Sequence, residues 1–215
     1  MIKLSKRLKA CADLVREGSR LADVGCDHGY VPVYLVQSGK IRSAVACDIK
    51  EGPLSSCRSL VSDYSLGDKI KCVLSDGLKN VGESEADCIL IAGMGGELIS
   101  KILTECDYAK EKHIILNPMT HPELARKWLF ENGFEIINDI IVHEDKHSYS
   151  VFDAEYSGEI KPYTDIDCFL GKINDYSDKR FFEHLLNYLG NKEKSGEDCS
   201  AVIGEIIRRC NNDNG

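Results

Sequence analysis

Short apolar runs recur at regular intervals along the first half of the chain. Each run is bounded by Gly, Asp or Asn, is continuously apolar rather than alternating, and is followed by a stretch that can be helical. Continuous runs of this kind are typical of strands buried on both faces of a parallel sheet. The runs cover residues 21–24, 44–47, 70–74, 88–92 and 113–116. We therefore predict an α/β domain in which five parallel strands alternate with helices.

The pattern changes on either side of these strands. Apolar residues three and four apart predict a helix over residues 1–20, ending at Gly18, and a second helix is predicted over residues 123–131. Two further strands are predicted at 134–142 and 149–156. The polar linker between them is too short for a crossover, so they must pair antiparallel. Five parallel strands followed by a hairpin predict a Rossmann-like, seven-stranded methyltransferase sheet rather than a dehydrogenase sheet.

Composition shifts after Gly158, and the rest of the chain has a helical pattern. We predict helices over residues 179–189 and 198–209, packed as a small antiparallel hairpin with a break at residues 190–192. The predicted division is therefore an AdoMet-binding domain at 1–158 and a helical appendage at 159–215, where AdoMet is S-adenosylmethionine.

The composition is that of a soluble globular protein, with 43% hydrophobic and 29% charged residues. No apolar run is long enough to cross a bilayer, so we expect no membrane partner. Because the N-terminus lacks a signal peptide pattern, we expect a cytoplasmic protein. We also expect a monomer. The ten cysteines include no CxxC pair, so we expect no structural metal.

The net charge is −8, which by itself argues against a nucleic-acid partner. However, residues 1–20 carry six Lys or Arg and only two carboxylates. A basic face of this kind can hold a phosphate backbone, although an ordinary solvated helix face is the alternative. The candidate RNA-binding residues are Lys3, Lys6, Arg7 and Lys9.

A glycine loop follows the first predicted strand, and it contains Asp23, Gly25 and Gly29. Its spacing does not match the GxGxxG of dinucleotide sites. A carboxylate before the first glycine would repel a pyrophosphate but attract an ammonium group. AdoMet has an ammonium, a sulfonium and no phosphate, so this loop favours AdoMet. A generic glycine turn of an α/β protein is the alternative.

Ligands of parallel sheets bind at the carboxyl ends of the strands, so the next loops supply further candidates. Asp48 is placed to accept the ribose hydroxyls, with a solvated strand-end carboxylate as the alternative. Asp76 is placed to accept the exocyclic amine of adenine. A glycine-rich turn after the fourth strand would lie against a flat group or near the reacting methyl. The candidate cofactor-binding residues of these loops are Asp48, Ile49, Asp76, Gly77, Ala92, Gly93 and Met94.

With these motifs, the sequence resembles the bacterial tRNA (adenine-22-N1)-methyltransferase family (TrmK) of class I AdoMet-dependent enzymes. The resemblance covers most of residues 1–157, and its specific parts are the Asp27-His28 pair in the glycine loop and the turn at residues 93–96. It implies a Rossmann-like domain, a coiled-coil-like appendage and methylation of adenine N1 in tRNA. The chain departs from the family in having Gly29 where we expect Ala, and its tail matches only in helical character.

Three residues are candidates for a catalytic role. Adenine N1 carries a lone pair, so positioning rather than a strong base is required. Asp27 could stabilise the positive charge that develops on the base, or it could only shape the turn or meet the cofactor. His28 could stack on or hydrogen-bond the base, or be structural. Asn117 could hydrogen-bond the base edge, although an Asn before Pro is also a common turn residue.

Other functions fit parts of the pattern. A class I methyltransferase acting on rRNA, protein or a small molecule would share the same cofactor loops. A non-catalytic RNA-binding module could retain the AdoMet pocket, although the acidic residues predicted to line it are all present. A dehydrogenase fits least, because the GxGxxG spacing is missing and the sheet ends in a hairpin.

Overall fold

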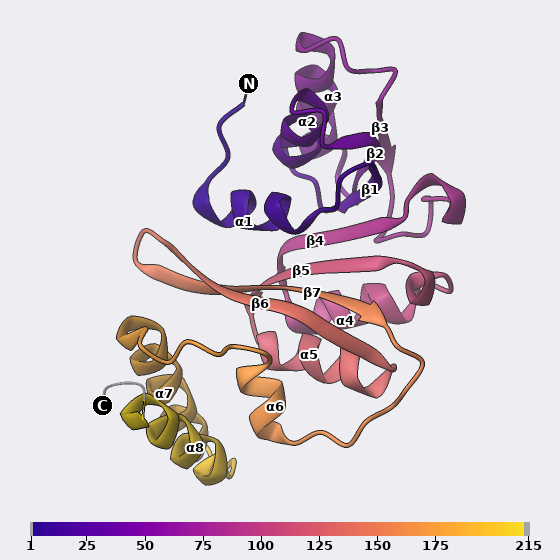
Figure 1. Cartoon of the computed structure of the whole chain (residues 1–215). Coiled ribbons are helices and arrows are strands. Elements are labelled where there is room, and N and C mark those ends of the chain that lie inside the picture. The colour runs from indigo at the N-terminus through magenta and orange to yellow at the C-terminus, as the bar shows by residue number, and fades with distance from the viewer. Residues whose placement is uncertain (1, 213–215) are drawn as a thin grey trace.

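A single seven-stranded sheet forms the centre of the computed structural model, which describes residues 2–212 (Figure 1). The strand order is β3-β2-β1-β4-β5-β7-β6. The strands are β1 (Ser19–Val24), β2 (Ile41–Asp48), β3 (Ile70–Leu74), β4 (Cys88–Gly95), β5 (His113–Thr120), β6 (Phe134–Glu144) and β7 (His147–Tyr156). The first five pair in parallel, and β7 pairs antiparallel with both β5 and β6. The predicted parallel sheet with a terminal hairpin is therefore confirmed.

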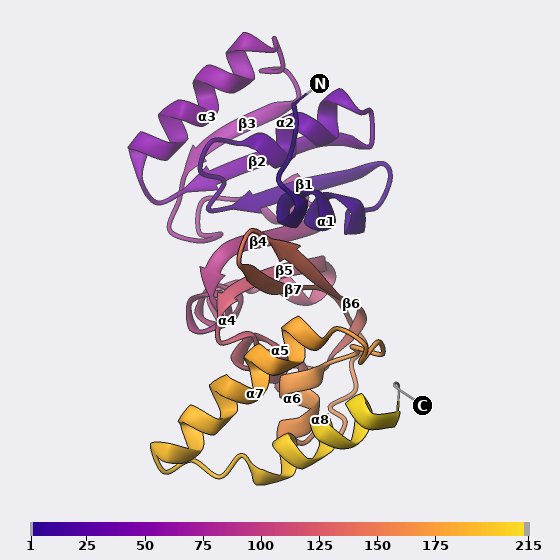
Figure 2. The same cartoon turned by 90° about the vertical axis from the view of Figure 1, so that its left-hand side faces the viewer.

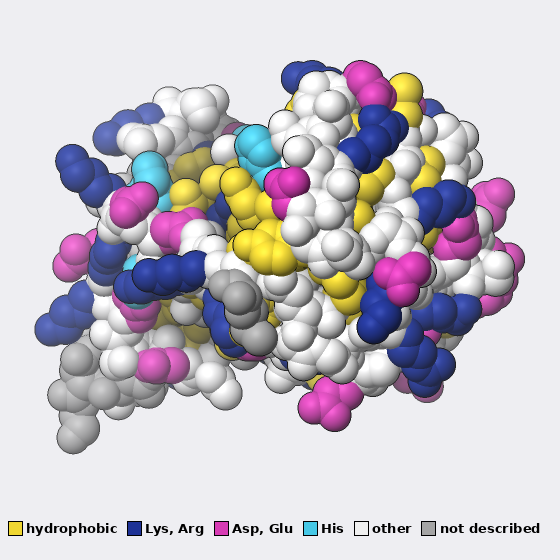
Figure 3. Space-filling model, turned by 90° about the horizontal axis from the view of Figure 1, so that it is seen from above, with side chains coloured by type: hydrophobic (Ala, Val, Ile, Leu, Met, Phe, Trp, Pro, Cys, Tyr) yellow, Lys and Arg dark blue, Asp and Glu magenta, His cyan; other side chains and the backbone are white. Residues whose placement is uncertain are grey.

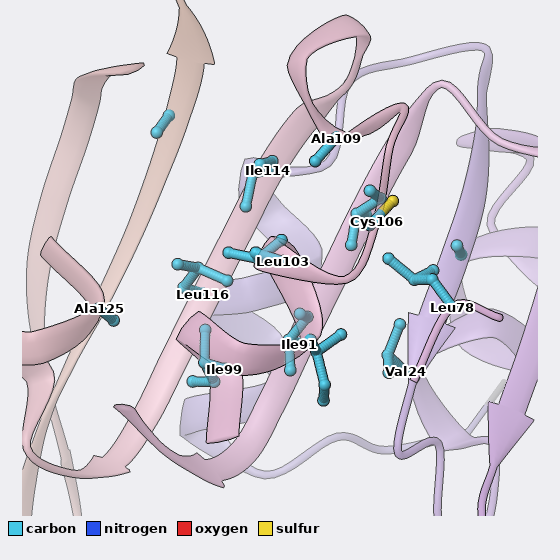
Figure 4. Close-up of a cluster of buried hydrophobic side chains, with 14 of the residues drawn as sticks. Val24, Leu78, Ile91, Ile99, Leu103, Cys106, Ala109, Ile114, Leu116 and Ala125 are labelled. Carbon is cyan, nitrogen blue, oxygen red and sulfur yellow. The ribbon is translucent and has the colours of Figure 1, made fainter. Parts of the chain in front are cut away.

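Helices cover both faces of this sheet and bury two hydrophobic cores. The helices are α1 (Lys6–Leu14), α2 (Tyr30–Gln37), α3 (Glu51–Asp63), α4 (Gly96–Thr104), α5 (Pro122–Glu131), α6 (Asp165–Leu170), α7 (Lys179–Lys194) and α8 (Ser200–Asn212), with 3-10 turns at Glu83–Glu85 and Ala109–Glu111. One core joins α1, α2 and α3 to the sheet, and the other joins α4 and α5 to the opposite face. Figure 4 shows the second core, where Ile99 and Leu103 of α4 lie over Ile91 and Leu116 of the strands.

Several elements differ in extent from the predictions. The first helix covers only Lys6–Leu14, because Ser5 caps its start and β1 already begins at Ser19. β4 and β5 continue beyond their apolar runs, since they remain paired as far as Gly95 and Thr120. The pairing shifts register around Gly93, whose φ is +84°. The glycine-rich turn is thus an irregular strand end rather than a free loop.

The C-terminal helices bury a core of their own, which includes Leu170, Phe182, Leu189 and Ile206. The predicted break at residues 190–192 is wrong, because α7 continues through Gly190 to Lys194. A single glycine costs a helix only about 1 kcal/mol, and the chain turns instead at Gly196, where φ is +100°. The division of the chain after residue 158 stays a prediction.

Helix α6 was not predicted from the sequence. It lies between the sheet domain and α7, packs on α5 and contacts α8 (Figure 2). Thr164 caps its start, and the Asp167 carboxylate accepts a hydrogen bond from the Thr164 backbone N–H at 2.8 Å. This capping pair is the only local signal for a helix that is too short to show hydrophobic periodicity.

A buried arginine joins α6 to the sheet domain. The Arg126 guanidinium on α5 donates two hydrogen bonds to the Asp139 carboxylate of β6, at 2.9 and 3.2 Å, and both side chains are fully buried. It also donates to the carbonyls of Cys168 and Phe169 in α6, each at 3.2 Å. One side chain therefore connects α5, β6 and α6.

Within residues 2–212 the cysteines form no disulfide bonds. Among residues 2–212, no group of three or more His, Cys, Asp or Glu is placed to hold a metal ion. No helix in the same range is long and apolar enough to cross a membrane.

Candidate functional site

Two carboxylates lie at the carboxyl ends of the central strands β1 and β2. Asp23 is 5% exposed and is flanked by Ala46 of β2 and Leu90 of β4, whereas Asp48 is half-buried. Burial, together with the negative charge of Asp48, raises the pKa of Asp23 to about 7. A buried acid beside a second acid favours a ligand that brings positive charge or hydrogen-bond donors.

The glycine loop folds tightly against its neighbours. Gly25 and Gly29 have φ values of +71° and +72°. A Cβ atom on Gly25 would lie 2.2 Å from the terminal methyl of Met94, and a Cβ on Gly29 would lie 2.4 Å from Sγ of Cys57. Gly29 is also the N-cap of α2, so the free N–H groups of the first helical turn lie at this loop. The positive φ values favour glycine at both positions, and the absence of a Cβ lets the backbone of Gly25 approach Met94 at the end of β4.

The end of β2 presents a polar and an apolar group side by side. One oxygen of Asp48, Oδ1, accepts a hydrogen bond from the backbone N–H of Lys50 at 2.8 Å. This contact orients the carboxylate. Ile49, the next residue, is 62% exposed, which is unusual for a large apolar side chain and suits a surface that covers a flat ring.

Asp76 lies after β3 and is exposed. It forms an ion pair with Lys79, and this contact lowers the pKa of the Asp76 carboxyl below its ordinary value. The next residue, Gly77, has a φ of +59°, and a Cβ atom added there would lie 3.1 Å from the Cγ2 methyl of Ile102 in α4. Asp76 is thus ionised and available to accept a hydrogen bond at the same edge as Asp23 and Asp48.

The end of β4 completes this edge of the sheet. Ala92 and Met94 are half-buried and Gly93 is exposed, with open space around the position that a Cβ would occupy. Gly96 begins α4, and a Cβ there would lie 2.0 Å from the carbonyl oxygen of His121. The two glycines therefore have different roles. Gly93 leaves open space beside the end of β4, and Gly96 allows the start of α4 to pack closely on the start of α5.

The candidate catalytic pair Asp27-His28 is exposed at the start of α2. Asp27 has a φ of +49°, which is rare for a residue with a side chain. Its carboxylate lies 3.7 Å from Nε2 of His28. The His28 ring in turn stacks on Tyr30, with 5.4 Å between the ring centroids. The pair is solvent-facing and is held by stacking rather than by burial.

Asn117 has a different environment from the one expected. It is fully buried, its side-chain amide donates to the Ser150 carbonyl at 2.9 Å, and its oxygen accepts from Arg7 at 2.7 Å. Both polar groups are thus occupied within the protein. A direct contact between Asn117 and a base would require these hydrogen bonds to break, so the structure favours a positioning role.

The four basic candidates of the N-terminal segment have different surroundings. Arg7 is turned inward, where it bonds Asn117 and lies 3.5 Å from the Glu144 carboxylate. Lys9 pairs with Asp13. Lys3 and Lys6 are exposed, and no ion pair is recorded for either within residues 2–212. Contact with RNA stays a prediction for all four, and Lys3 and Lys6 have the accessible charges that it requires.

The structure therefore brings most of the predicted cofactor residues to one edge of the sheet. The strand order places the ends of β1, β2, β3 and β4 next to one another. No local pattern predicts the contacts made by Arg7 or Arg126, because their partners are 110 and 13 residues away and belong to other elements.

Comparisons with known proteins agree with this geometry. A family described as a methyltransferase domain matches residues 4–152. The tRNA (adenine(22)-N(1))-methyltransferase of Bacillus subtilis (strain 168) is 36% identical over 177 residues, which cover 80% of this chain and 73% of that protein.

Solved structures share the whole fold, including the helical appendage. A Streptococcus pneumoniae protein solved in complex with S-adenosyl-L-methionine is 31% identical, with a TM-score of 0.85 over 97% of this chain and 100% of that one. TrmK of M. capricolum, solved in complex with S-adenosyl-homocysteine, is 27% identical, with a TM-score of 0.77 over 98% and 96%. The Rossmann-like methyltransferase fold is thus confirmed, and the chain belongs to the methyltransferase family of the bacterial tRNA (adenine(22)-N(1))-methyltransferases.

Proposed function

We propose that this protein transfers a methyl group from AdoMet to N1 of adenine 22 in tRNA. The observation that carries the proposal is the buried Asp23, which lies near Asp48 at the carboxyl edge of the sheet. The glycine loop that follows it has positive φ values at Gly25 and Gly29, so its backbone is accessible to a ligand without a Cβ in the way. The choice of substrate is supported by the similarity to the B. subtilis protein, which is named for adenine 22 of tRNA.

The residues at this edge fit AdoMet. The ammonium of its amino-acid end would neutralise Asp23, whose burial near another carboxylate otherwise raises its pKa. The free oxygen of Asp48 would accept from the ribose hydroxyls, and Ile49 and Asp76 would meet the face and the amine of adenine. Gly25, Gly29, Gly77, Ala92, Gly93 and Met94 would line the remaining cofactor surface. AdoMet supplies an activated methyl group on its sulfonium.

The protein's own task is then to hold the target base in line with this methyl group. Adenine N1 lies on the pairing edge, so the base must be unpaired and unstacked before it reacts, at a cost of a few kcal/mol. Asp27 is exposed beside the loop, where its carboxylate would stabilise the positive charge that N1 acquires. The stacked rings of His28 and Tyr30 offer a surface for a displaced base.

The proposal is tested by incubating the protein with labelled AdoMet and tRNA from a bacterium that lacks the modification. We expect one methyl group per tRNA, at adenine 22, when the product is digested and mapped. A tRNA in which guanine replaces this adenine should remain unlabelled. If the natural tRNA takes up no label, or is labelled on another base, the assignment is wrong.

A further inference from the structure

A cavity of about 240 Å³ lies between the sheet domain and the appendage, outside the predicted cofactor edge. One wall is the end of β5 and the start of α5, from Pro118 to Glu123. The other wall is α7, which contributes Phe181, His184 and Tyr188. The cavity is smaller than the usual pocket for a drug-sized ligand, so its size suits one ring system.

The wall of this cavity contains a carboxylate with one unused oxygen. Glu123 is 6% exposed. Its Oε1 accepts a hydrogen bond from the Tyr188 hydroxyl at 3.0 Å and lies 3.2 Å from Nδ1 of His121. Its other oxygen, Oε2, is buried and has no hydrogen-bond partner among residues 2–212. A buried acceptor without a donor is costly and rare, so it calls for a ligand that supplies the donor.

The remaining lining favours a flat aromatic ligand. Pro118 and Met119 are apolar, and the rings of Tyr149, Phe169 and Phe181 also border the cavity. Aromatic rings and carboxylates together recognise nucleobases that carry an exocyclic amine, since the ring faces stack while the N–H group donates to the acid.

The surface beside the cavity suits the phosphates of the same ligand. A groove of about 550 Å³ shares Met119, Tyr149 and His184 with the cavity, and its charged lining is the three cations Lys146, Lys179 and Arg180 and one carboxylate, Glu183. These three cations are exposed. A base in the cavity would therefore place its backbone against positive charge, which is the arrangement that single-stranded RNA requires.

We propose that this cavity binds an unpaired base of the RNA substrate, and that Glu123 Oε2 accepts a hydrogen bond from the exocyclic amine of that base. The proposal rests on the proposed function, because it takes RNA to be the substrate. The base is an unpaired neighbour of the target adenine, because the target itself must lie at the cofactor edge beside Asp27 and His28.

The test measures the affinity of the full chain for unmodified tRNA by fluorescence anisotropy. The tRNAs carry single replacements of adenine by purine, or of cytosine by 2-pyrimidinone, each of which removes only the exocyclic amine. Glu123→Met removes the acceptor, and Tyr188→Phe is the control, because it removes the neighbouring hydroxyl but leaves Oε2 in place. Equal AdoMet affinity and equal melting temperature would show that the variants are folded.

We expect the wild-type protein and Tyr188→Phe to lose about tenfold in affinity when the recognised base lacks its amine, whereas Glu123→Met binds both tRNAs equally. The coupling should appear at an unpaired position other than 22, and coupling at position 22 alone would overturn the proposal. If Glu123→Met and the amine replacements act independently at every position, the proposal is overturned. Since binding is measured without turnover, this result is separate from a failure of methylation.

Discussion

Asp23 shows how one residue links the cofactor site to the stability of the fold. Its carboxyl has a pKa of about 7 in the folded protein, against 3.8 for an ordinary Asp. Between these values the folded state keeps a proton that the unfolded state has lost. Stability from this group is therefore complete below about pH 4 and is lost as the pH rises through 7.

The expected result is a fall in the free energy of unfolding between pH 5 and pH 8 that Asp23→Asn largely removes. The difference between the two proteins should be on the order of a few kcal/mol, since each unit of pKa shift corresponds to about 1.4 kcal/mol. Urea denaturation at the two pH values, without AdoMet, measures it. Equal losses in both proteins would show that Asp23 is not buried as described.

Asp48 is predicted to bind the ribose of AdoMet. Asp48→Ala should weaken AdoMet binding by more than about tenfold, because the ribose hydroxyls would lose a charged acceptor. Titration calorimetry measures the affinity. Asp68→Ala, which removes an exposed carboxylate near β3, is the matched control and should bind as the wild type does. An unchanged affinity of Asp48→Ala would remove the ribose assignment.

The shared location of the residues at the strand ends could be predicted, because each buried strand is visible in the sequence as an apolar run. Asp48 and Asp76 come just after apolar runs and Asp23 lies near the end of one, and parallel strands end at the same edge. The environment of Asn117 could not be predicted in this way. Its burial depends on Arg7 and Ser150, which reach it from α1 and β7, and no local pattern records such contacts.

At the scale of elements, strands were more predictable than helix ends. All seven strands were found, because buried strands need continuous apolar residues. The ends of β4 and β5 were placed too early, since their pairing continues into polar and glycine positions. Helix α6 was missed and α7 was cut short at Gly190, because packing against Leu170, Leu189 and Ile206 outweighs the local preferences of single residues.

The Arg126 side chain, oriented by its ion pair with Asp139, is predicted to hold α6 on the sheet domain through its hydrogen bonds to the carbonyls of Cys168 and Phe169. Arg126→Leu leaves the Asp139 carboxylate buried without its partner and should lower the free energy of unfolding by about 3–5 kcal/mol. The double variant Arg126→Leu/Asp139→Leu should be less destabilised, because neither charge remains. Urea denaturation measures both, with the exposed Lys127→Ala as the control. A double variant as unstable as the single one would contradict this account.

At the scale of the molecule, an acidic protein must present RNA with local positive charge. Lys and Arg side chains are interspersed with Asp and Glu on the face seen from above (Figure 3). The described residues with accessible charge include Lys3 and Lys6 in the N-terminal segment, and Lys146 and Lys179 in the groove beside the cavity. Binding should therefore depend on a few cations rather than on net charge.

We expect Lys3→Gln/Lys6→Gln to weaken tRNA binding and to reduce the slope of log affinity against log salt by about 1 to 2, since each phosphate contact contributes about 0.7–0.9. The control Lys161→Gln/Lys172→Gln makes the same change in net charge, but its lysines pair with Glu135. It should leave the slope nearly unchanged. Equal slopes for both variants would rule out a role for the N-terminal lysines.

The guanidinium of Arg126 has one further consequence. Because it also donates to two carbonyls at the end of α6, moving that helix away would break these buried hydrogen bonds, whereas the ion pair with Asp139 inside the sheet domain would remain. These contacts favour one fixed position of α6 on the sheet domain. We therefore expect the conformational adjustment on binding to occur mainly in the RNA.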